Sequence, residues 1–266
     1  MDFVCRNFDT TLNSVSQVIS VSEKQIQSTL NHDWENQFDA DRNCPNRSDL
    51  STDTFTGNLG EYILLNGFPD AELPFERPTV HWFHGTRTAV PEDFLRYGVL
   101  PLPKMYPKIK QMVDNIADTL NIKIKNGISK VQDQGRFQAE LKLRNPKNQD
   151  GPFAMLMYDA LSDPQAFDDH NYIDEPEIIV DYAMMKYGED ADLILKEFKR
   201  IAFPVIVEFV EPENTDELPL RLLIDTAIQY LYGIIHKGKT RTDGNICFSG
   251  HGYDIPSSSI IKIYRL

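Results

Sequence analysis

The chain has 266 residues, enough for one large domain or for a domain with an appended segment. Its composition, 41% hydrophobic and 25% charged, is that of a globular protein, and it contains no apolar run of about 18 residues that would predict a membrane helix. A net charge of −13 argues against a general nucleic-acid-binding protein, because phosphate groups are bound by cations.

The beginning of the chain lacks the basic region and apolar block of a secretory signal, so we expect none. The three cysteines, Cys5, Cys44 and Cys247, lie far apart and do not have the paired spacing of a zinc site or a disulfide framework. We therefore expect reduced thiols, no metal ion and a cytoplasmic location.

Residues 1–75 are polar and weakly patterned, and we expect a partly helical N-terminal extension that packs on a main domain of residues 76–266. Residues 42–58 are rich in Asn, Pro, Ser and Asp, which predicts a loop. The stretch LGEYILLNGF that follows predicts a short helix that ends near Gly67. Such an extension is compatible both with covering a functional site and with recruiting a partner.

The pattern sharpens from Pro78 onward. Residues 79–83 alternate with a period of two, which predicts a strand that stops at the glycine after it. The stretch VPEDFLRYG predicts a short helix with Pro91 in its first turn and Gly98 at its end. Apolar residues then recur at helical spacing from Met105 to Leu120, which predicts an amphipathic helix with a cationic flank.

Two strands are predicted after this helix. The first covers Phe137 to Leu143 and carries Lys and Arg on its outer face. The second is the apolar run from Pro152 to Leu161, which is expected to be buried. The acids of DEPE at 174–177 form either a carboxylate cluster or a capping box, and we favour a capping box that opens the helix IIVDYAMMKYG.

The last part of the chain predicts a strand at 203–212, a helix at 218–231 and two further strands, in NICFSG and in SSIIKIYRL. Strands and helices therefore mix without a regular βαβ repeat, which predicts an α+β fold.

Charge is unevenly distributed along the chain. The segment from Lys104 to Lys147 holds ten Lys or Arg and four acids, so its net charge is 10 − 4 = +6. The segment from Asp159 to Asp192 holds eleven acids and one lysine. These segments are interpreted either as solvated faces or as surfaces that attract a polyanion and a basic partner.

One constellation offers chemistry. The motifs GxxxxGK[ST], GxGxxG, HExxH and GxSxG are all absent, which disfavours phosphate-loop and α/β-hydrolase activities. His84, Gly85 and Thr86 follow the strand at 79–83. Glycine lets a ligand approach the backbone, and the side chains beside it can bond ribose-like hydroxyls. Tyr158 is the best-placed aromatic residue to stack on a planar ring.

The segment FHGTRTAVPEDFLRYGVLPL resembles the first strand and following helix of ADP-ribosyltransferases of the histidine–tyrosine–glutamate type. The segment YDIPSSSIIKI is similar to the isoleucine–proline segment before the last strand of many ADP-ribosyltransferase toxins. The resemblance covers residues 78–266 and implies a split β-sandwich with flanking helices that uses NAD as co-substrate.

The resemblance also implies roles for single residues. His84 would bind the nicotinamide ribose, the Gly85 backbone would hold the carboxamide, and Thr86 would support the ribose. Tyr158 would stack on nicotinamide, and Arg87 would belong to the same NAD-binding set.

The family's catalytic glutamate has no counterpart in TDGNICFSGHGYDIP. We choose Asp243 as its replacement and keep Glu208, an acid in an apolar strand, as the alternative. Members without the glutamate often transfer a single unit, so the resemblance implies a mono-ADP-ribosyltransferase. It would be a toxin or defence effector that modifies RNA, DNA or protein and is neutralised by an antitoxin. NAD hydrolysis and a non-catalytic ADP-ribosyl-binding module remain alternatives.

Overall fold

A computed structural model describes residues 1–42, 58–124, 129–144, 151–162, 173–212, 218–239 and 244–266. Among these residues helices flank a six-stranded sheet, so the fold is α+β as expected. Residue contacts divide the chain into two compact units, each built from segments that are distant in the sequence. The first comprises Met1–His81, Leu156–Asp168 and Glu217–Ile246, and the second comprises Trp82–Met155, Asp169–Asp216 and Cys247–Leu266. These units do not coincide with a division at residue 75, because two later segments pack with the N-terminal helices.

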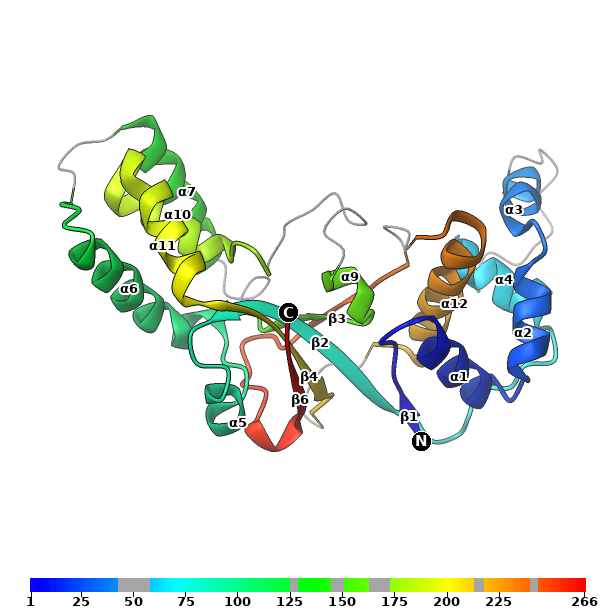
Figure 1. Ribbon diagram of the computed structural model, residues 1–266. Helices are drawn as coiled ribbons and strands as arrows, with labels where there is room; N and C mark the ends of the chain where they lie inside the picture. Colours follow the sequence, from blue (N-terminus) through cyan, green and yellow to red (C-terminus); the bar gives the residue numbers. More distant parts are fainter. Residues whose placement is uncertain (43–57, 125–128, 145–150, 163–172, 213–217, 240–243) are drawn as a thin grey trace. The chain divides into compact units, whose positions relative to one another are not determined.

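The first unit is mainly helical. It contains β1 (Asp2–Phe3), α1 (Phe8–Ile19), α2 (Glu23–Leu30), α3 (Trp34–Arg42), α4 (Leu59–Gly67), α9 (Tyr158–Ser162) and α12 (Leu220–Lys237). Capping boxes at Asn7 and Ser22 start α1 and α2, which explains two helices that the polar composition of this region hid. Figure 1 shows α12 packed between α1 and α4, and nearly all of its middle turns are buried.

A polar stripe crosses the contact between α4 and α12. Arg221, Asp225 and Gln229 recur every four residues and therefore share one face of α12. The Gly60 N–H donates to Gln229 Oε1 at 3.2 Å, and Arg221 Nη2 lies 3.3 Å from Glu61 Oε1. A Cβ at Gly60 would lie 2.0 Å from the Asp225 carbonyl oxygen, so only glycine permits this approach of the two helices.

The second unit contains the rest of the sheet. Its strands are β2 (Thr79–Thr88, whose first residues pair with β1 in the first unit), β3 (Phe153–Met155), β4 (Phe203–Val210), β5 (Cys247–Ser249) and β6 (Ile260–Arg265). The strand order is β5-β3-β2-β4-β6, and the pairings β2–β3, β3–β5 and β4–β6 are antiparallel. Trp82 and Phe209 both pack on the ring of Phe248, which anchors the sheet's apolar face.

A group of helices with its own apolar core belongs to the same unit. It consists of α6 (Leu102–Thr119), α7 (Lys130–Arg144), α10 (Glu177–Tyr187) and α11 (Ala191–Ile201), which Figure 1 shows side by side. The short elements α5 (Asp93–Tyr97), η2 (Gly188–Asp190) and η3 (Ser257–Ser259) complete the unit. Lys142 of α7 binds both Glu177 and Asp181 of α10, so a partly buried ion-pair cluster fixes these two helices to each other.

The strand predicted at Phe137 to Leu143 is wrong, because these residues lie in α7. The buried positions of α7 are Gln132, Gly135 and Ala139, which follow helical spacing. A Cβ at Gly135 would lie 2.6 Å from the Met185 nitrogen, so the glycine lets α7 approach α10 closely. The period-two pattern within the segment was therefore coincidental.

Two further expectations need correction. The predicted strand from Pro152 to Leu161 is strand only in β3, and the chain then turns into α9 at Tyr158. The capping box at 174–177 does not form, because α10 has Pro176 at its N-cap and no side-chain capping bond. Asp174 instead forms ion pairs with Arg87 and Lys199.

Other predicted elements are confirmed. The helix that ends at Gly67 is α4, the helix from Met105 is α6, and the predicted helix at 218–231 is α12. The strands predicted at 203–212, in NICFSG and in SSIIKIYRL are β4, β5 and β6. Within the described ranges, no helix is long and apolar enough to cross a membrane.

Candidate functional site

The sequence HGT lies within β2 rather than after its end, because β2 continues to Thr88. Trp82 and Phe83 are buried, whereas the residues from His84 to Thr88 keep part of their surface exposed. β2 lies between β3 and β4 in the sheet. The strand therefore has a buried half and a partly exposed half.

His84 is fixed by a hydrogen bond to the neighbouring strand. Its Nδ1 lies 2.7 Å from the Phe153 carbonyl oxygen, and because a carbonyl only accepts, Nδ1 must carry the hydrogen. Desolvation by the surrounding protein lowers the pKa of His84 below 6.5, and the bond to Phe153 opposes that effect without reversing it. The imidazole is therefore neutral near pH 7, and its Nε2 is a hydrogen-bond acceptor.

The resemblance singles out the segments around His84, Tyr158 and the missing glutamate, and these segments contribute three neighbouring strands. β3 pairs with β2 through Met155 opposite Phe83, and β5 pairs with β3 through Cys247 opposite Met155. Residues 82–88, 153–155 and 247–249 are thus brought side by side from three distant parts of the chain. β5 itself carries no acidic side chain.

The residues after α5 also contact the isoleucine–proline segment YDIPSSSIIKI. The Val99 N–H donates to the Ile255 carbonyl oxygen at 3.0 Å, and the Ile255 N–H donates back to Val99 at 2.9 Å. Gly98 ends α5 as expected, with φ of +74°, and a Cβ there would lie 1.9 Å from the Ile255 carbonyl oxygen. Glycine is therefore required where the turn after α5 contacts the isoleucine–proline segment.

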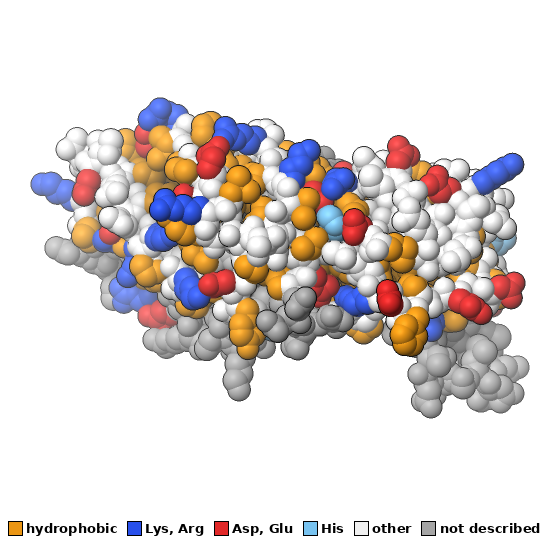
Figure 2. Space-filling view, turned by 90° about the horizontal axis from the view of Figure 1, so that it is seen from below, with side chains coloured by type: hydrophobic (Ala, Val, Ile, Leu, Met, Phe, Trp, Pro, Cys, Tyr) orange, Lys and Arg blue, Asp and Glu red, His pale blue; other side chains and the backbone are white. Residues whose placement is uncertain are grey.

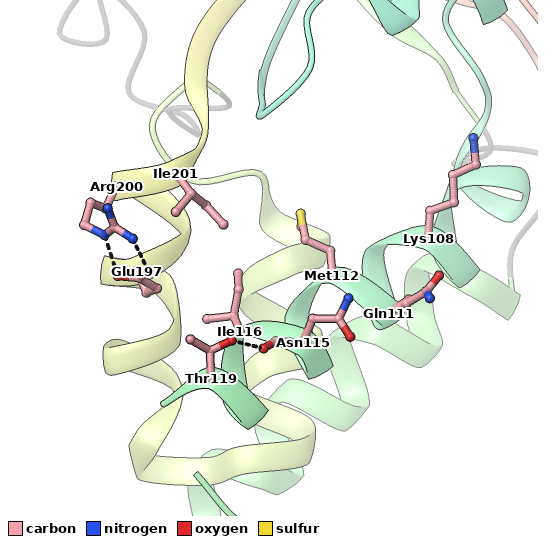
Figure 3. Close-up of a pocket in the computed structure, with 9 residues that line it drawn as sticks. All are labelled: Lys108, Gln111, Met112, Asn115, Ile116, Thr119, Glu197, Arg200 and Ile201. Carbon is pink, nitrogen blue, oxygen red and sulfur yellow. Dashed lines mark hydrogen bonds and ion pairs between the residues drawn. The ribbon is translucent and has the colours of Figure 1, made fainter. Parts of the chain in front are cut away.

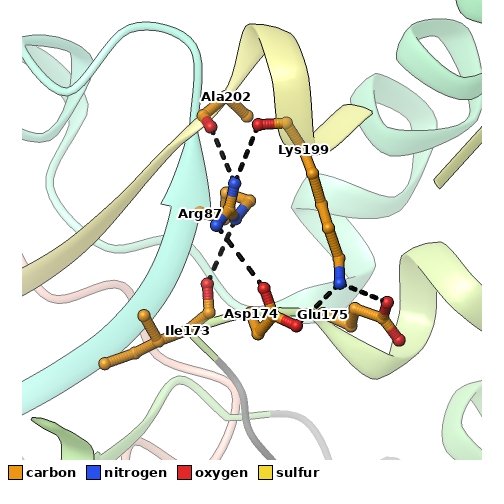
Figure 4. Close-up of polar contacts among 6 residues, drawn as sticks. All are labelled: Arg87, Ile173, Asp174, Glu175, Lys199 and Ala202. Carbon is orange, nitrogen blue, oxygen red and sulfur yellow. Dashed lines mark hydrogen bonds and ion pairs between the residues drawn. The ribbon is translucent and has the colours of Figure 1, made fainter. Parts of the chain in front are cut away.

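Arg87 serves as a structural bridge (Figure 4). Its Nη1 donates to the carbonyl oxygens of Lys199 and Ala202 at 2.9 and 3.0 Å, and its Nε donates to Ile173 at 3.3 Å. Asp174 lies 3.6 Å from Nη2, and the Arg87 side chain is only 12% exposed. These contacts tie β2 to the end of α11 and to the segment before α10, so this guanidinium has a packing role. The NAD contact expected for Arg87 stays a prediction.

The remaining predicted site residues lie elsewhere. Tyr158 belongs to the first unit, at the start of α9 and half-buried, and burial followed by the charge of Asp159 raises its pKa. Asp243 lies outside the described residues. Glu208 is fully buried in β4 and accepts a hydrogen bond from the Tyr264 hydroxyl at 2.6 Å. Since β4 lies between β2 and β6, Glu208 is not on an edge strand.

Two aromatic residues, Phe94 and Phe153, contact His84 and were not predicted from the sequence. Phe94 of α5 meets the imidazole edge-on, with ring centroids 6.5 Å apart, and Phe153 supplies the carbonyl that holds Nδ1 while its own side chain is 40% exposed. Phe94 is an apolar residue of the short helix that follows the HGT strand, a signal that the sequence contained. The role of the Phe153 backbone depends on strand register, which the sequence did not reveal.

Two lysines in the described part of the basic segment are paired with acids. Lys104 pairs with Asp254 at 2.7 Å, and Lys142 pairs with Glu177 and Asp181 of α10. Figure 2 shows blue Lys and Arg side chains interspersed with red acidic and orange hydrophobic ones. Among the described residues no three His, Cys, Asp or Glu side chains gather in a way that would hold a metal ion.

Comparison of the chain with protein-family models, with curated proteins and with solved structures finds no match.

Proposed function

We propose that this protein is an NAD-dependent mono-ADP-ribosyltransferase whose nicotinamide-ribose site is built on β2. The observation that carries the proposal is the adjacency of β2, β3 and β5, which brings the histidine strand beside the strand that precedes Tyr158 in the sequence and the strand that follows Asp243. An antiparallel sheet with flanking helices is also compatible with the split β-sandwich that the resemblance implies.

The geometry of His84 suits the proposed role. Its Nδ1–H is occupied by Phe153, so the imidazole presents only Nε2 and accepts a hydrogen bond from a ribose hydroxyl. Gly85 has no side chain and is partly exposed, so we expect its backbone to approach the planar carboxamide, with the Thr86 hydroxyl beside it.

In the reaction, the bond between the ribose carbon and the nicotinamide nitrogen breaks and its electron pair leaves with neutral nicotinamide. A nucleophile of a macromolecular target forms the new bond to that carbon and loses its proton to solvent. Hydrogen bonds that strengthen as positive charge develops on the ribose lower the barrier.

The test separates the proposed role of His84 from a structural one. An asparagine at position 84 keeps a donor near the position of Nδ1 but has no counterpart of Nε2. His84→Asn is expected to keep the wild-type melting temperature and lose at least about a hundredfold in nicotinamide release, as loss of a contact made in the transition state would cause. The matched control is His32→Asn in the other unit, where the histidine is exposed and bonds Gln37. If His84→Asn releases nicotinamide within threefold of wild type, the proposal is wrong.

A further inference from the structure

A groove runs between α6 and α11 in the second unit (Figure 3). Its volume is about 510 Å³, within the range of ligand-binding clefts. Met112 and Ile116 of α6 and Ile201 of α11 form its apolar floor, and Figure 3 shows them pointing into the space between the helices. Its residues come from α6 and α11 alone, and none of them lies on the strand that carries His84.

One rim of the groove offers unused amides. Gln111 and Asn115 line it from α6, and within the described part of the chain the structure gives neither side-chain amide a hydrogen-bond partner. Thr119 continues the row, but its hydroxyl already donates to the Asn115 carbonyl oxygen at 2.8 Å. A primary amide both donates and accepts, so each of the two can bond a C=O and an N–H at once.

The spacing of these amides matches an extended chain. Four residues of α-helix rise by about 6 Å, and two residues of extended chain advance by about 6.6 Å. Gln111 and Asn115 thus face every second residue of a strand laid along α6, and from Gln111 to Thr119 the groove takes about four residues. Met112 and Ile116 have the same spacing, so alternate apolar side chains of that strand would reach the floor.

The charges of the lining residues indicate which charge a bound segment should carry. Arg200 is held by Glu197 through bonds of 2.8 and 2.6 Å, so these two charges balance. Lys108 lies at the end of the groove, 4.9 Å from the centre of the Tyr97 ring, with no carboxylate partner among the described side chains. Two cations and one carboxylate leave the lining at 2 − 1 = +1, which favours one acidic side chain in the occupant.

Nucleic acid fits this lining less well. The Glu197 carboxylate would repel phosphates, and the lining contains no aromatic ring on which a base would stack. A helical partner would leave the two amides without exposed backbone groups to bond, because its own N–H and C=O groups are internally paired.

We propose that the α6–α11 groove binds an extended segment of a partner protein, about four residues long, with alternating apolar side chains and an acidic residue beside Lys108. Backbone bonds to Gln111 and Asn115 would hold the segment, and its apolar side chains would cover Met112, Ile116 and Ile201. Binding at this surface does not require NAD or His84, so its test is independent of the proposed enzymatic activity.

The test uses the full chain labelled in its methionine and isoleucine methyl groups and titrated with the pentapeptide Ac-Leu-Glu-Leu-Glu-Leu-amide. The resonances of Met112, Ile116 and Ile201 are expected to shift and saturate with a Kd near or below about 1 mM. Gln111→Ala/Asn115→Ala is expected to weaken binding at least about tenfold. The matched control is Gln134→Ala, which removes an exposed amide from α7.

Two further changes, one in the peptide and one in the protein, test the backbone bonds and the charge preference. N-methylation of alternate backbone amides is expected to abolish binding, and Lys108→Glu is expected to reverse the preference from the glutamate peptide to its lysine counterpart. The proposal is overturned if these methyl groups do not shift, or if the double variant or the N-methylated peptide binds like the reference. Saturating shifts with pentauridylate and none with the peptide would identify a nucleic-acid groove instead.

Discussion

Replacing Asp225 with asparagine is expected to stabilise the protein at alkaline pH but much less at acid pH. Asp225 is 2% exposed, its Oδ1 has no hydrogen-bond partner, and it lies on the polar stripe where α12 meets Glu61 of α4. Burial and then the charge of Glu61 raise its pKa from 3.8 to about 7, and Arg221 opposes this without cancelling it. The folded protein therefore holds a proton that the unfolded chain has already lost at neutral pH.

The sign and size follow from proton linkage. Because the folded-state pKa is raised, stability falls as pH rises from 3.8 to about 7 and is constant above that range. The full difference corresponds to at most about 4 kcal/mol, of which roughly 2 to 3 kcal/mol is lost between about pH 5 and about pH 8. Asparagine does not ionise, so its advantage in unfolding free energy should grow by up to that amount over this range.

Urea unfolding of wild type and Asp225→Asn at about pH 5 and about pH 8 measures this gain in unfolding free energy. Asp9→Asn is the control, because Asp9 is exposed in the first turn of α1 and its effect should be the same at both. If the difference between Asp225→Asn and wild type does not change with pH, Asp225 is not the buried acid described here.

The remaining predictions concern the proposed site and its support. Tyr158→Ala should reduce NAD use more than Tyr158→Phe, since stacking needs the ring and not the hydroxyl, and steady-state kinetics showing both variants equally poor would exclude stacking. Arg87→Met should lower the unfolding free energy by about 3 kcal/mol, because it leaves buried carbonyls unpaired. Lys199→Met breaks a partly exposed ion pair and should cost less than about 1 kcal/mol. Similar losses for both variants in urea unfolding would refute the structural role of Arg87. Since the pKa of His84 is lowered, the pH at which nicotinamide release falls to half of its maximum should lie below 6.5, and a half-maximal rate above 6.5 would contradict the neutral imidazole. Expression in bacteria should slow growth unless His84 is replaced by asparagine, and equal growth at equal protein levels would favour a binding module.

Elements with strong local signals could be predicted from the sequence. The apolar runs of β4 and β6 and the helical periodicity of α6 and α12 identified these elements within a few residues. The expectation failed at α7, because Phe137 to Leu143 alternates like a strand while the residues that it buries against α10 follow helical spacing. Tertiary packing decided that segment.

The candidate site was only partly visible in the sequence. His84, Gly85 and Thr86 could be singled out, since their chemistry lies in one short stretch. The bond from His84 to Phe153 and the bridge from Arg87 to α11 join residues that are 69 and 112 or more positions apart. Such pairings depend on strand register and helix packing, and no local pattern encodes them.

The most direct test of the central claim is the fate of NAD labelled with one isotope in nicotinamide and another in adenine. Wild-type protein, incubated with separate bacterial RNA, DNA and protein fractions, is expected to release the nicotinamide label and to place the adenine label on one fraction. His84→Asn should do neither. Release of nicotinamide with the adenine label recovered only as free ADP-ribose would show hydrolysis in place of transfer. Intact NAD in every fraction, with wild-type protein that is folded, would contradict the proposed activity altogether.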